Sequence, residues 1–299
     1  MEAYTHYGKQ ADVFKHLVLC EILKNEKPSI YVETNSACAM YRLEHTPEQE
    51  LGIYHFLRES PLCNQLANSC YYNLENEALS NHNYYGSPAL AMRLLGKTAD
   101  RYYFFDIEKT SLENVSSFAE KESLENHIIL RNCDSTKGVM DLLPALSKQT
   151  FIHIDPYEID KEGIDGHTFF DLFLKASSLG MKCLLWYGFM TTDEKQRLDE
   201  YISSHLHKYA ITNVLNIKLI LNSIERDTIP CNPGILGSGL LASNLTEKSR
   251  LQFIELSHKL VDIYKDVKYK NHDGSLFCEL QSMYLSGQPY QKSTFICRK

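Results

Sequence analysis

Short apolar runs alternate along the chain with segments of helical periodicity. The clearest run is Thr150 to Ile154, which is rich in β-branched and aromatic residues and is typical of a strand buried in a parallel sheet. It ends at Asp155, Pro156 and Tyr157, where proline turns the chain because it cannot continue a strand ladder. The pattern predicts further strands at 29–34, 101–106, 127–131, 181–187, 210–221, 237–243 and 275–281, and helices at 9–23, 89–95, 109–121, 138–146, 168–178, 193–206 and 246–264.

Regular alternation of strands and helices predicts an α/β fold, a parallel sheet with helices on both faces. The first two expected strands are separated by too many residues for a plain crossover, so we expect a small helical insertion at 46–95, with 64–85 as loop or short helix. The main domain is then formed by 1–45 and 96–281, followed by a tail at 282–299. The pair 210–221 and 237–243 has no helix between its members, which predicts a hairpin and one antiparallel edge strand.

Composition places the chain among ordinary globular proteins. Hydrophobic residues make up 43% of the 299 residues and charged residues 23%. No apolar run approaches the roughly 20 residues that span a bilayer. The first residues lack the basic and then apolar layout of a signal peptide. We therefore expect a soluble, cytoplasmic protein without a membrane partner, and a monomer.

The nine cysteines are scattered, odd in number and without a Cys-x-x-Cys pair, which argues against a zinc ribbon and a disulfide framework. No His-x-x-x-His spacing occurs, so no metal site is expected. The net charge of −7 and the pI of about 6.0 argue against a wide electrostatic footprint on nucleic acid. A nucleic-acid substrate would have to be gripped by a local patch.

The turn after the 150–154 strand carries the candidate chemistry. In open α/β sheets, ligands bind at the carboxyl ends of the strands. The Asp155 carboxylate and the Pro156 carbonyl can accept both hydrogens of an exocyclic amine, while the Tyr157 ring stacks on the base that carries it. Methyl transfer to an adenine or cytosine amino group requires this arrangement. The alternative interpretation is a strand that merely stops at an Asp-Pro turn.

Acids also end three other strands, at Glu33, Asp106 and Asp134, and we expect these side chains to face one crevice together with Asp155. The loop after the first strand, Asn35 to Ala39, has the place of a nucleotide-binding turn but lacks glycine. Because alanine and cysteine resist positive φ, this loop is an altered version of such a turn.

Six segments carry a resemblance to a known family. They are ADVFKHLV at 11–18, YVETNSACAMYRL at 31–43, YYGSPALAMRLL at 84–95, IHIDPYE at 152–158, LLWY at 184–187 and GSGLLASN at 237–244. Through them the chain resembles the RlmJ family of bacterial 23S rRNA adenine-N6 methyltransferases, in the same order from about residue 8 to residue 281. The resemblance implies a Rossmann-like class I fold, S-adenosylmethionine as cofactor, ribosomal RNA as substrate and a role in rRNA processing.

The resemblance also implies roles for single residues. Asp155 takes the place of the catalytic aspartate, with the Pro156 carbonyl beside it, and Tyr157 takes that of the base-stacking aromatic residue. Tyr4 matches a substrate-contacting tyrosine near the N-terminus. The family's cofactor contacts fall on His16, Asn35 (a histidine in the family), Ser87, Asp106, Asp134 and Ser135. A helix histidine such as His16 has a weak claim to function when it is considered alone.

Three departures from the family keep other functions open. The family's Asp-Pro-Pro-Tyr is shortened to Asp155-Pro156-Tyr157, the loop at 35–39 has lost its glycines, and Asn-Pro-Pro-Trp is replaced by Asn-Leu-Thr-Glu at 244–247. One alternative is a catalytically impaired binding protein of methyltransferase fold. Another is a role in the use of external DNA as a nutrient, a label attached to the family, although the metal-binding carboxylate clusters of a nuclease are missing.

Overall fold

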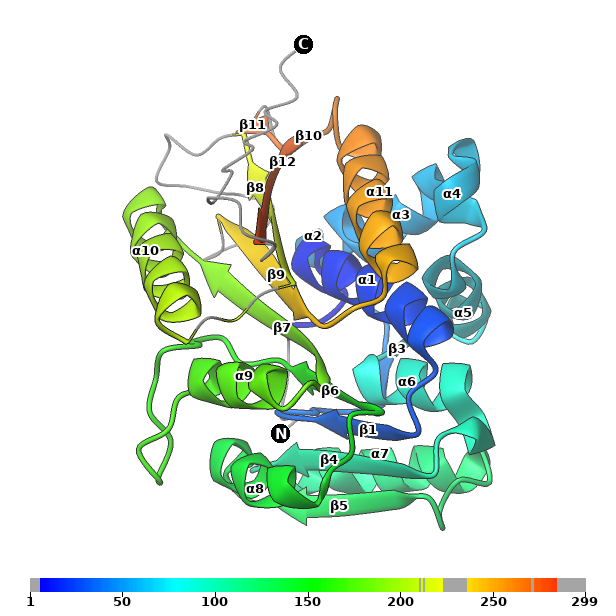
Figure 1. Cartoon of the computed structure of the whole chain (residues 1–299). Coiled ribbons are helices and arrows are strands. Elements are labelled where there is room, and N and C mark those ends of the chain that lie inside the picture. Colours follow the sequence, from blue (N-terminus) through cyan, green and yellow to red (C-terminus); the bar gives the residue numbers. More distant parts are fainter. Residues whose placement is uncertain (1–5, 210, 212, 223–235, 270–271, 284–299) are drawn as a thin grey trace.

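The computed structural model describes residues 6–209, 211, 213–222, 236–269 and 272–283. Figure 1 shows a twisted central sheet between two layers of helices. The eight strands of this sheet are, in spatial order, β12 (Leu276–Met283), β8 (Val214–Leu221), β9 (Gly237–Ser243), β7 (Lys182–Phe189), β6 (Thr150–Ile154), β1 (Ile30–Glu33), β4 (Arg101–Asp106) and β5 (Ile128–Asn132).

The strands β5, β4, β1, β6 and β7 pair in parallel, and β9 runs antiparallel to both β7 and β8. This topology confirms the predicted Rossmann-like α/β fold. The predicted position of the antiparallel strand was wrong. Because β8 and β9 form a hairpin and β9 also pairs with β7, the reversed strand β9 lies inside the sheet. A second antiparallel strand, β12, forms the edge beside β8.

Helices cover the two faces of the sheet, and each face has its own core. On one face lie α1 (Gln10–Glu26), α6 (Ser87–Leu95), α7 (Lys109–Lys121) and α11 (Glu247–Ile263); on the other lie α8 (Ser135–Leu142), α9 (Phe169–Ser178) and α10 (Thr192–Lys208). Alternation along β6 sends Phe151 to the α1 face and Ile152 and Ile154 to the α9 face.

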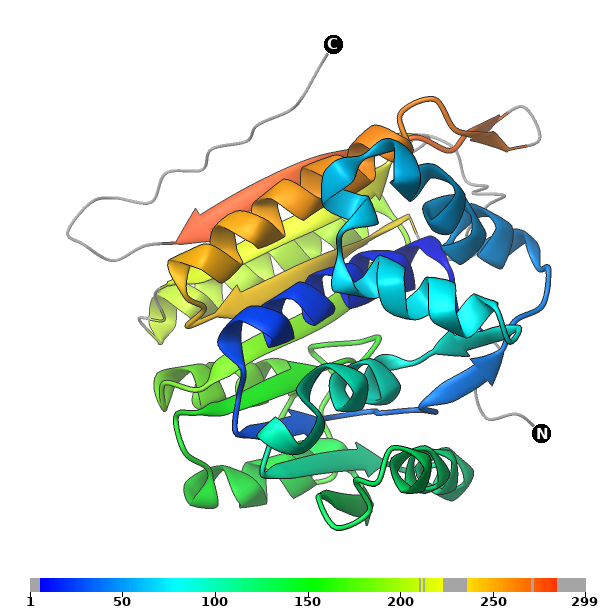
Figure 2. The same ribbon diagram turned by 90° about the vertical axis from the view of Figure 1, so that its right-hand side faces the viewer.

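The α1 helix is central to the α1 face. It packs against α11 on one side and against α5 (Cys70–Leu79) and α6 on the other, as Figure 2 shows. Because neighbours surround it, α1 is buried from Ala11 to Leu23 except at Asp12, and the buried residues include the polar Lys15 and His16. It begins where the Lys9 N–H donates to Asp12 Oδ2, at 3.3 Å, and ends at a left-handed Lys27.

The segment 46–95 is mainly helical, with α2 (Pro47–Leu51), α3 (Ile53–Glu59), α4 (Asn64–Ala67), α5 and α6. Of the loop or short helix expected at 64–85, the structure has short helices, α4 and the ten-residue Cys70–Leu79, which is capped by the Ser69 hydroxyl. The segment also contains the short strand β3 (Asn83–Tyr85), which pairs antiparallel with β2 (Met40–Arg42) of the preceding chain. Its separation as an inserted unit stays a proposal.

The remaining short elements are the 3-10 helices Ser60–Leu62, Gly96–Thr98 and Leu143–Ala145 and the strand pair β10 (Lys268–Tyr269) and β11 (His272–Asp273). Among the described residues, no helix has both the length and the apolar character needed to cross a bilayer.

Candidate active site

Asp155 directly follows β6 at the carboxyl edge of the sheet, and its backbone is tied to the end of β1. The Asp155 N–H donates to Thr34 Oγ1 at 3.1 Å, and the Thr34 N–H donates to the carbonyl of His153 at 3.0 Å. These bonds continue the parallel β1–β6 register, in which Glu33 lies opposite His153. The sheet therefore holds the start of the Asp155-Pro156-Tyr157 turn in a fixed position beside the first loop.

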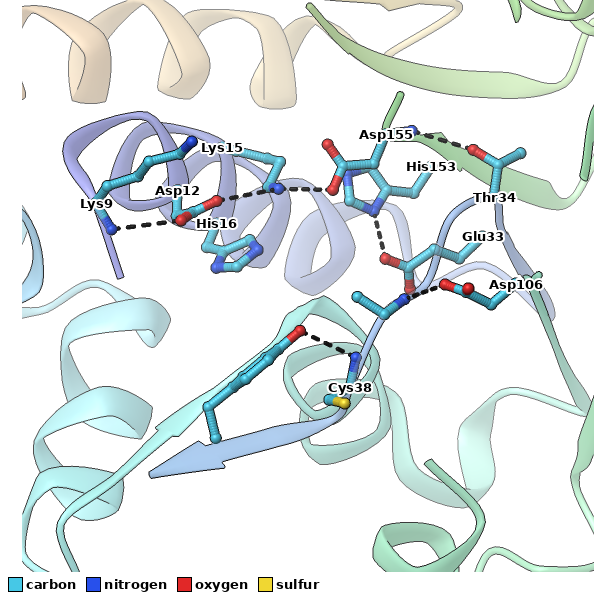
Figure 3. A network of polar contacts seen from close by, with 12 residues as sticks. Lys9, Asp12, Lys15, His16, Glu33, Thr34, Cys38, Asp106, His153 and Asp155 are labelled. Carbon is cyan, nitrogen blue, oxygen red and sulfur yellow. Dashed lines mark hydrogen bonds and ion pairs between the residues drawn. The ribbon is translucent and has the colours of Figure 1, made fainter. Parts of the chain in front are cut away.

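A buried lysine from α1 pairs with this aspartate. Lys15 Nζ lies 2.6 Å from Asp155 Oδ2 and 3.3 Å from Asp12 Oδ1, as Figure 3 shows. Burial lowers the pKa of Lys15, but the Asp155 and Asp12 carboxylates together outweigh this effect and raise it above the ordinary value. The ammonium is therefore charged throughout the physiological pH range.

Two aromatic rings complete this part of the site. The Trp186 ring centroid lies 5.5 Å from Lys15 Nζ. A Cβ at Gly188 would meet Trp186 at 3.1 Å and Tyr157 Cε2 at 3.2 Å, so both rings lie against the bare backbone of this glycine. Tyr157 is 42% exposed and Pro156 is buried. The turn therefore presents an aromatic ring to solvent near the carboxylate of Asp155.

The loop after β1 adopts a conformation that its sequence disfavours. Asn35 and Ala37 have φ values of 51° and 52° although neither is glycine. The chain's own side chains hold this loop, because the Ala37 N–H donates to Asp106 Oδ2 at 2.8 Å and the Cys38 N–H donates to the Tyr41 hydroxyl at 3.0 Å. The loop thus keeps the left-handed backbone of a glycine-rich turn without the glycines.

The other cofactor candidates gather around the same loop. Asp106 Oδ1 accepts the N–H of Glu108, at 2.8 Å, in addition to the bond from Ala37. Ser135 Oγ donates to Asn35 Oδ1 at 3.1 Å. Asp134 caps α8 by accepting the Lys137 N–H at 3.0 Å. The structure therefore brings Asn35, Asp106 and Ser135 together, with Asp134 at the start of the adjoining helix.

His16 lies on α1 beside Lys15 but projects from another side of the helix, toward the loop that carries Cys38 (Figure 3). Its Nδ1 is 2.8 Å from the Tyr84 hydroxyl. Burial lowers the pKa of His16 well below its ordinary value, and the neighbouring Lys15 and His153 lower it further, so the imidazole is neutral. Ser87, buried at the first turn of α6, follows Tyr84 by three residues.

Glu33 does not face the site as expected. Its side chain is fully buried, accepts the Tyr31 hydroxyl at 2.9 Å and lies 3.0 Å from His153 Nδ1. The reason is that the neighbouring side chains Tyr31 and His153 engage its two carboxylate oxygens within the sheet–α1 layer, before the strand end is reached. Tyr4, the expected substrate contact, lies outside the described residues.

Sequence analysis missed Lys15 and Trp186 as parts of the site. A lysine on a helix is normally solvated, and a lone tryptophan within an apolar strand is normally core. The one available signal was the position of Lys15 between the apolar residues Phe14 and Leu17, which marks a buried stripe of the helix.

Several buried polar atoms near this edge have no hydrogen-bond partner among the described residues. They are His16 Nε2, Ser36 Oγ, Thr136 Oγ1 and Trp186 Nε1. Such groups cost free energy unless a ligand or water satisfies them. Together with the Asp106 and Asp134 carboxylates they form a donor and acceptor set that fits S-adenosylmethionine, which carries hydroxyls, a carboxylate and amino groups. Within the described ranges, no cluster of histidine, cysteine and acidic residues could hold a metal ion, and all seven cysteines there are free thiols.

Two characterised relatives are similar to this chain. A protein named ribosomal RNA large subunit methyltransferase J from Haemophilus influenzae is 26% identical over 261 residues, which cover 80% of this chain and 84% of the relative. Its namesake from Escherichia coli is 25% identical over 260 residues, with the same coverage. No family model matches the chain.

A solved structure supports the fold. The crystal structure of a Legionella pneumophila protein, described under the family model DUF519, superposes with a TM-score of 0.71. It covers 93% of this chain and 98% of that protein, at 22% sequence identity. The similarity therefore extends over nearly the whole of both chains.

Proposed function

We propose that this chain, a divergent relative of the large-subunit ribosomal RNA methyltransferases, transfers a methyl group from S-adenosylmethionine to the N6 amino group of an adenine in 23S-like rRNA. The resemblance inferred from its motifs is confirmed by the two relatives named above. The observation that carries the proposal is the placement of Asp155, which ends β6 at the carboxyl edge, pairs with the buried Lys15 and lies beside the half-exposed Tyr157 ring.

The turn would act on the amine of the target base. Lys15 engages Asp155 Oδ2, so Oδ1 is the oxygen available for one amine hydrogen, and the Pro156 carbonyl accepts the other. Tyr157 stacks on the face of the adenine, which must be unpaired or flipped out of a helix to reach it. Holding both hydrogens orients the nitrogen lone pair toward the methyl donor, so catalysis consists mainly of positioning.

The residues around the first loop would hold the cofactor. S-adenosylmethionine, when bound, supplies an electrophilic methyl group on its sulfonium. Asp106 lies at the strand end that in such folds binds ribose hydroxyls, and Asn35, Asp134 and Ser135 lie beside it. His16 and Ser87 lie on the helices that flank the loop.

The partner in this proposal is RNA. With a net charge of −7 the chain would grip RNA through a local patch, and affinity would then fall less steeply with salt than for a basic protein. A cytoplasmic location and a monomeric state belong to the same proposal.

The test is transfer of a labelled methyl group to protein-free 23S rRNA that lacks the modification. Asp155→Asn loses one acceptor for the amine, so we expect its kcat to fall by about 100-fold or more. Its affinity for S-adenosylhomocysteine should stay close to that of the wild type. Asp193→Asn, an exposed acid in the first turn of α10, serves as the matched control. Equal turnover in the two variants would remove the role assigned to Asp155.

A second candidate is a methyltransferase-fold binding protein without activity. The observation that favours it is the use of both Asp106 oxygens by the backbone N–H groups of Ala37 and Glu108. Calorimetric titration decides between the two: the absence of binding at millimolar S-adenosylmethionine supports the inactive protein, whereas saturable binding supports the enzyme.

A further inference from the structure

A row of three buried side chains links the helical segment 46–95 to α1. His16 Nδ1 lies 2.8 Å from the Tyr84 hydroxyl, which lies 3.4 Å from the Tyr71 hydroxyl. The three residues come from α1, β3 and α5 and are at most 4% exposed. His16 Nε2 is buried and has no partner in the part of the chain that the structure describes. The row therefore begins in α5 and ends at an unsatisfied atom of the candidate cofactor site.

The direction of the protons in this row follows from where each direction leaves its unsatisfied donor. If Tyr71 donates to Tyr84 and Tyr84 donates to His16 Nδ1, every hydroxyl hydrogen has an acceptor and the remaining ring hydrogen is on Nε2. If His16 Nδ1–H donates to Tyr84 and Tyr84 donates to Tyr71, the Tyr71 hydrogen has no acceptor in its buried position. Each direction thus leaves one buried donor without an acceptor among the described residues, His16 Nε2–H in the first and the Tyr71 hydroxyl in the second. The first direction is favoured because its remaining donor lies at the candidate cofactor site, where a ligand can accept it. It also places the shorter bond on the more basic acceptor, the ring nitrogen. The neutral state of the imidazole makes this comparison applicable.

We propose that Tyr84 is a positioning residue that fixes His16 in the Nε2–H tautomer. The Nε2–H group then points a hydrogen-bond donor at the carboxylate, which is the anionic group of the cofactor. The inference rests on the proposed function. The segment 46–95 then contributes to cofactor binding, because its residue Tyr84 orients His16.

Nitrogen-15 spectroscopy of the imidazole rings in the ligand-free full-length protein tests the tautomer directly. Two-bond hydrogen–nitrogen correlations distinguish Nε2–H from Nδ1–H rings, and loss of one set of signals in His16→Asn assigns His16. We expect the Nε2–H pattern with a hydrogen-bonded Nδ1. In Tyr84→Phe, the Nδ1 resonance should move to the position of a free acceptor. An Nδ1–H pattern in the wild type would overturn the proposal.

Binding of S-adenosylhomocysteine, measured by calorimetry, gives a second readout with a matched control. Tyr84→Phe removes the hydroxyl that contacts His16, so we expect roughly tenfold weaker binding. Tyr71→Phe removes an equally buried hydroxyl one step further away and leaves the Tyr84–His16 bond, so we expect nearly unchanged binding. Equal losses in the two variants would point to a merely structural role for the row and would contradict the proposal.

The failure of this inference can be told apart from failure of the proposed function. If wild-type protein binds no S-adenosylhomocysteine, the methyltransferase function falls, and the ligand assigned to His16 falls with it. If wild-type protein binds the cofactor product but His16 carries its hydrogen on Nδ1, only the inference about Tyr84 falls.

Discussion

Lys15 is a buried cation held between two carboxylates, and its removal should affect both activity and stability. Lys15→Met leaves Asp155 and Asp12 without their cation in a site from which water is largely excluded. We expect the free energy of unfolding to fall by about 3 kcal/mol and methyl transfer to fall with it. Urea unfolding and the labelled-methyl assay measure the two effects.

The matched control is Lys109→Met, an exposed lysine on α7 that pairs with the equally exposed Glu113. Exposed pairs contribute little, so its free energy of unfolding should change by less than about 1 kcal/mol. If the free energy of unfolding falls equally in the two variants, the burial of the Lys15–Asp155 pair does not account for the effect.

Because Gly188 has no side chain, the Tyr157 ring of the shortened Asp155-Pro156-Tyr157 turn can lie against its backbone. A Cβ at this position would stand 3.2 Å from Tyr157 and 3.1 Å from Trp186. In Gly188→Ala we therefore expect the Tyr157 ring to shift, with KM for RNA raised several-fold and cofactor affinity unchanged. Kinetics at varied RNA concentration check this, and an unaltered KM would show that the ring tolerates the methyl group.

Asp155, Asp106 and Ser135 were predicted at the carboxyl edge of the sheet, because an apolar run followed by an acid indicates the end of a strand. The prediction for Glu33 was wrong because its carboxylate is held by Tyr31 and His153, and the contact with His153 of the neighbouring strand is not visible in local sequence. His16 had only a weak claim to function from the sequence, because neither the burial of α1 on several sides nor the nearness of Tyr84 is visible in local sequence.

Among the elements, the loop after β1 stores backbone strain. Ala37 has a φ of 52°, a conformation that costs a non-glycine residue about 1 kcal/mol. Ala37→Gly relieves this strain but also loosens the unfolded chain, so we expect a net gain of about 0.5 kcal/mol in the free energy of unfolding. Thermal unfolding measures it.

Ala39→Gly is the control for Ala37→Gly. Ala39 is fully buried in the same loop and is not among the positive-φ residues, so glycine there should destabilise the protein. A destabilised Ala37→Gly variant would contradict the strain assigned to this loop.

At the same scale, some elements were predicted to the residue and others were missed. The strands Thr150–Ile154, Arg101–Asp106 and Gly237–Ser243 agree with prediction because each is an apolar run with clear limits. For Cys70–Leu79 the sequence left loop and short helix open, because asparagine and tyrosine are weak helix formers and packing against α1 decides the conformation. The β2–β3 pair depends on contacts between residues 40 and 85, which no local pattern reports.

For the whole molecule, a buried acid makes stability depend on pH. Burial raises the pKa of Glu75 on α5 well above its ordinary 4.5, which outweighs the bond from the Tyr85 N–H. Above about pH 4.5 the unfolded chain loses this proton while the folded chain retains it. The unfolded state then binds fewer protons, so the free energy of unfolding falls as the pH rises from the unfolded pKa toward the folded one.

Glu75→Gln should remove this dependence and stabilise the protein more at pH 8 than at pH 5. Urea unfolding of both proteins at the two pH values measures the difference. Glu77→Gln, an exposed acid on the same helix, should leave the pH dependence in place. If Glu75→Gln stabilises the protein equally at both pH values, the raised pKa is not the cause.

Two consecutive residues of α1 contact different parts of the site: Lys15 reaches the turn after β6, and His16 reaches β3. A helix advances by about 100° per residue, so one residue inserted just before Lys15 would swing both side chains away from their partners together. A change of length in a surface loop leaves these two contacts in place, whereas a change in the number of residues between Lys9 and Lys15 breaks both. The contacts of Lys15 and His16 therefore depend together on the rotational phase of this one helix.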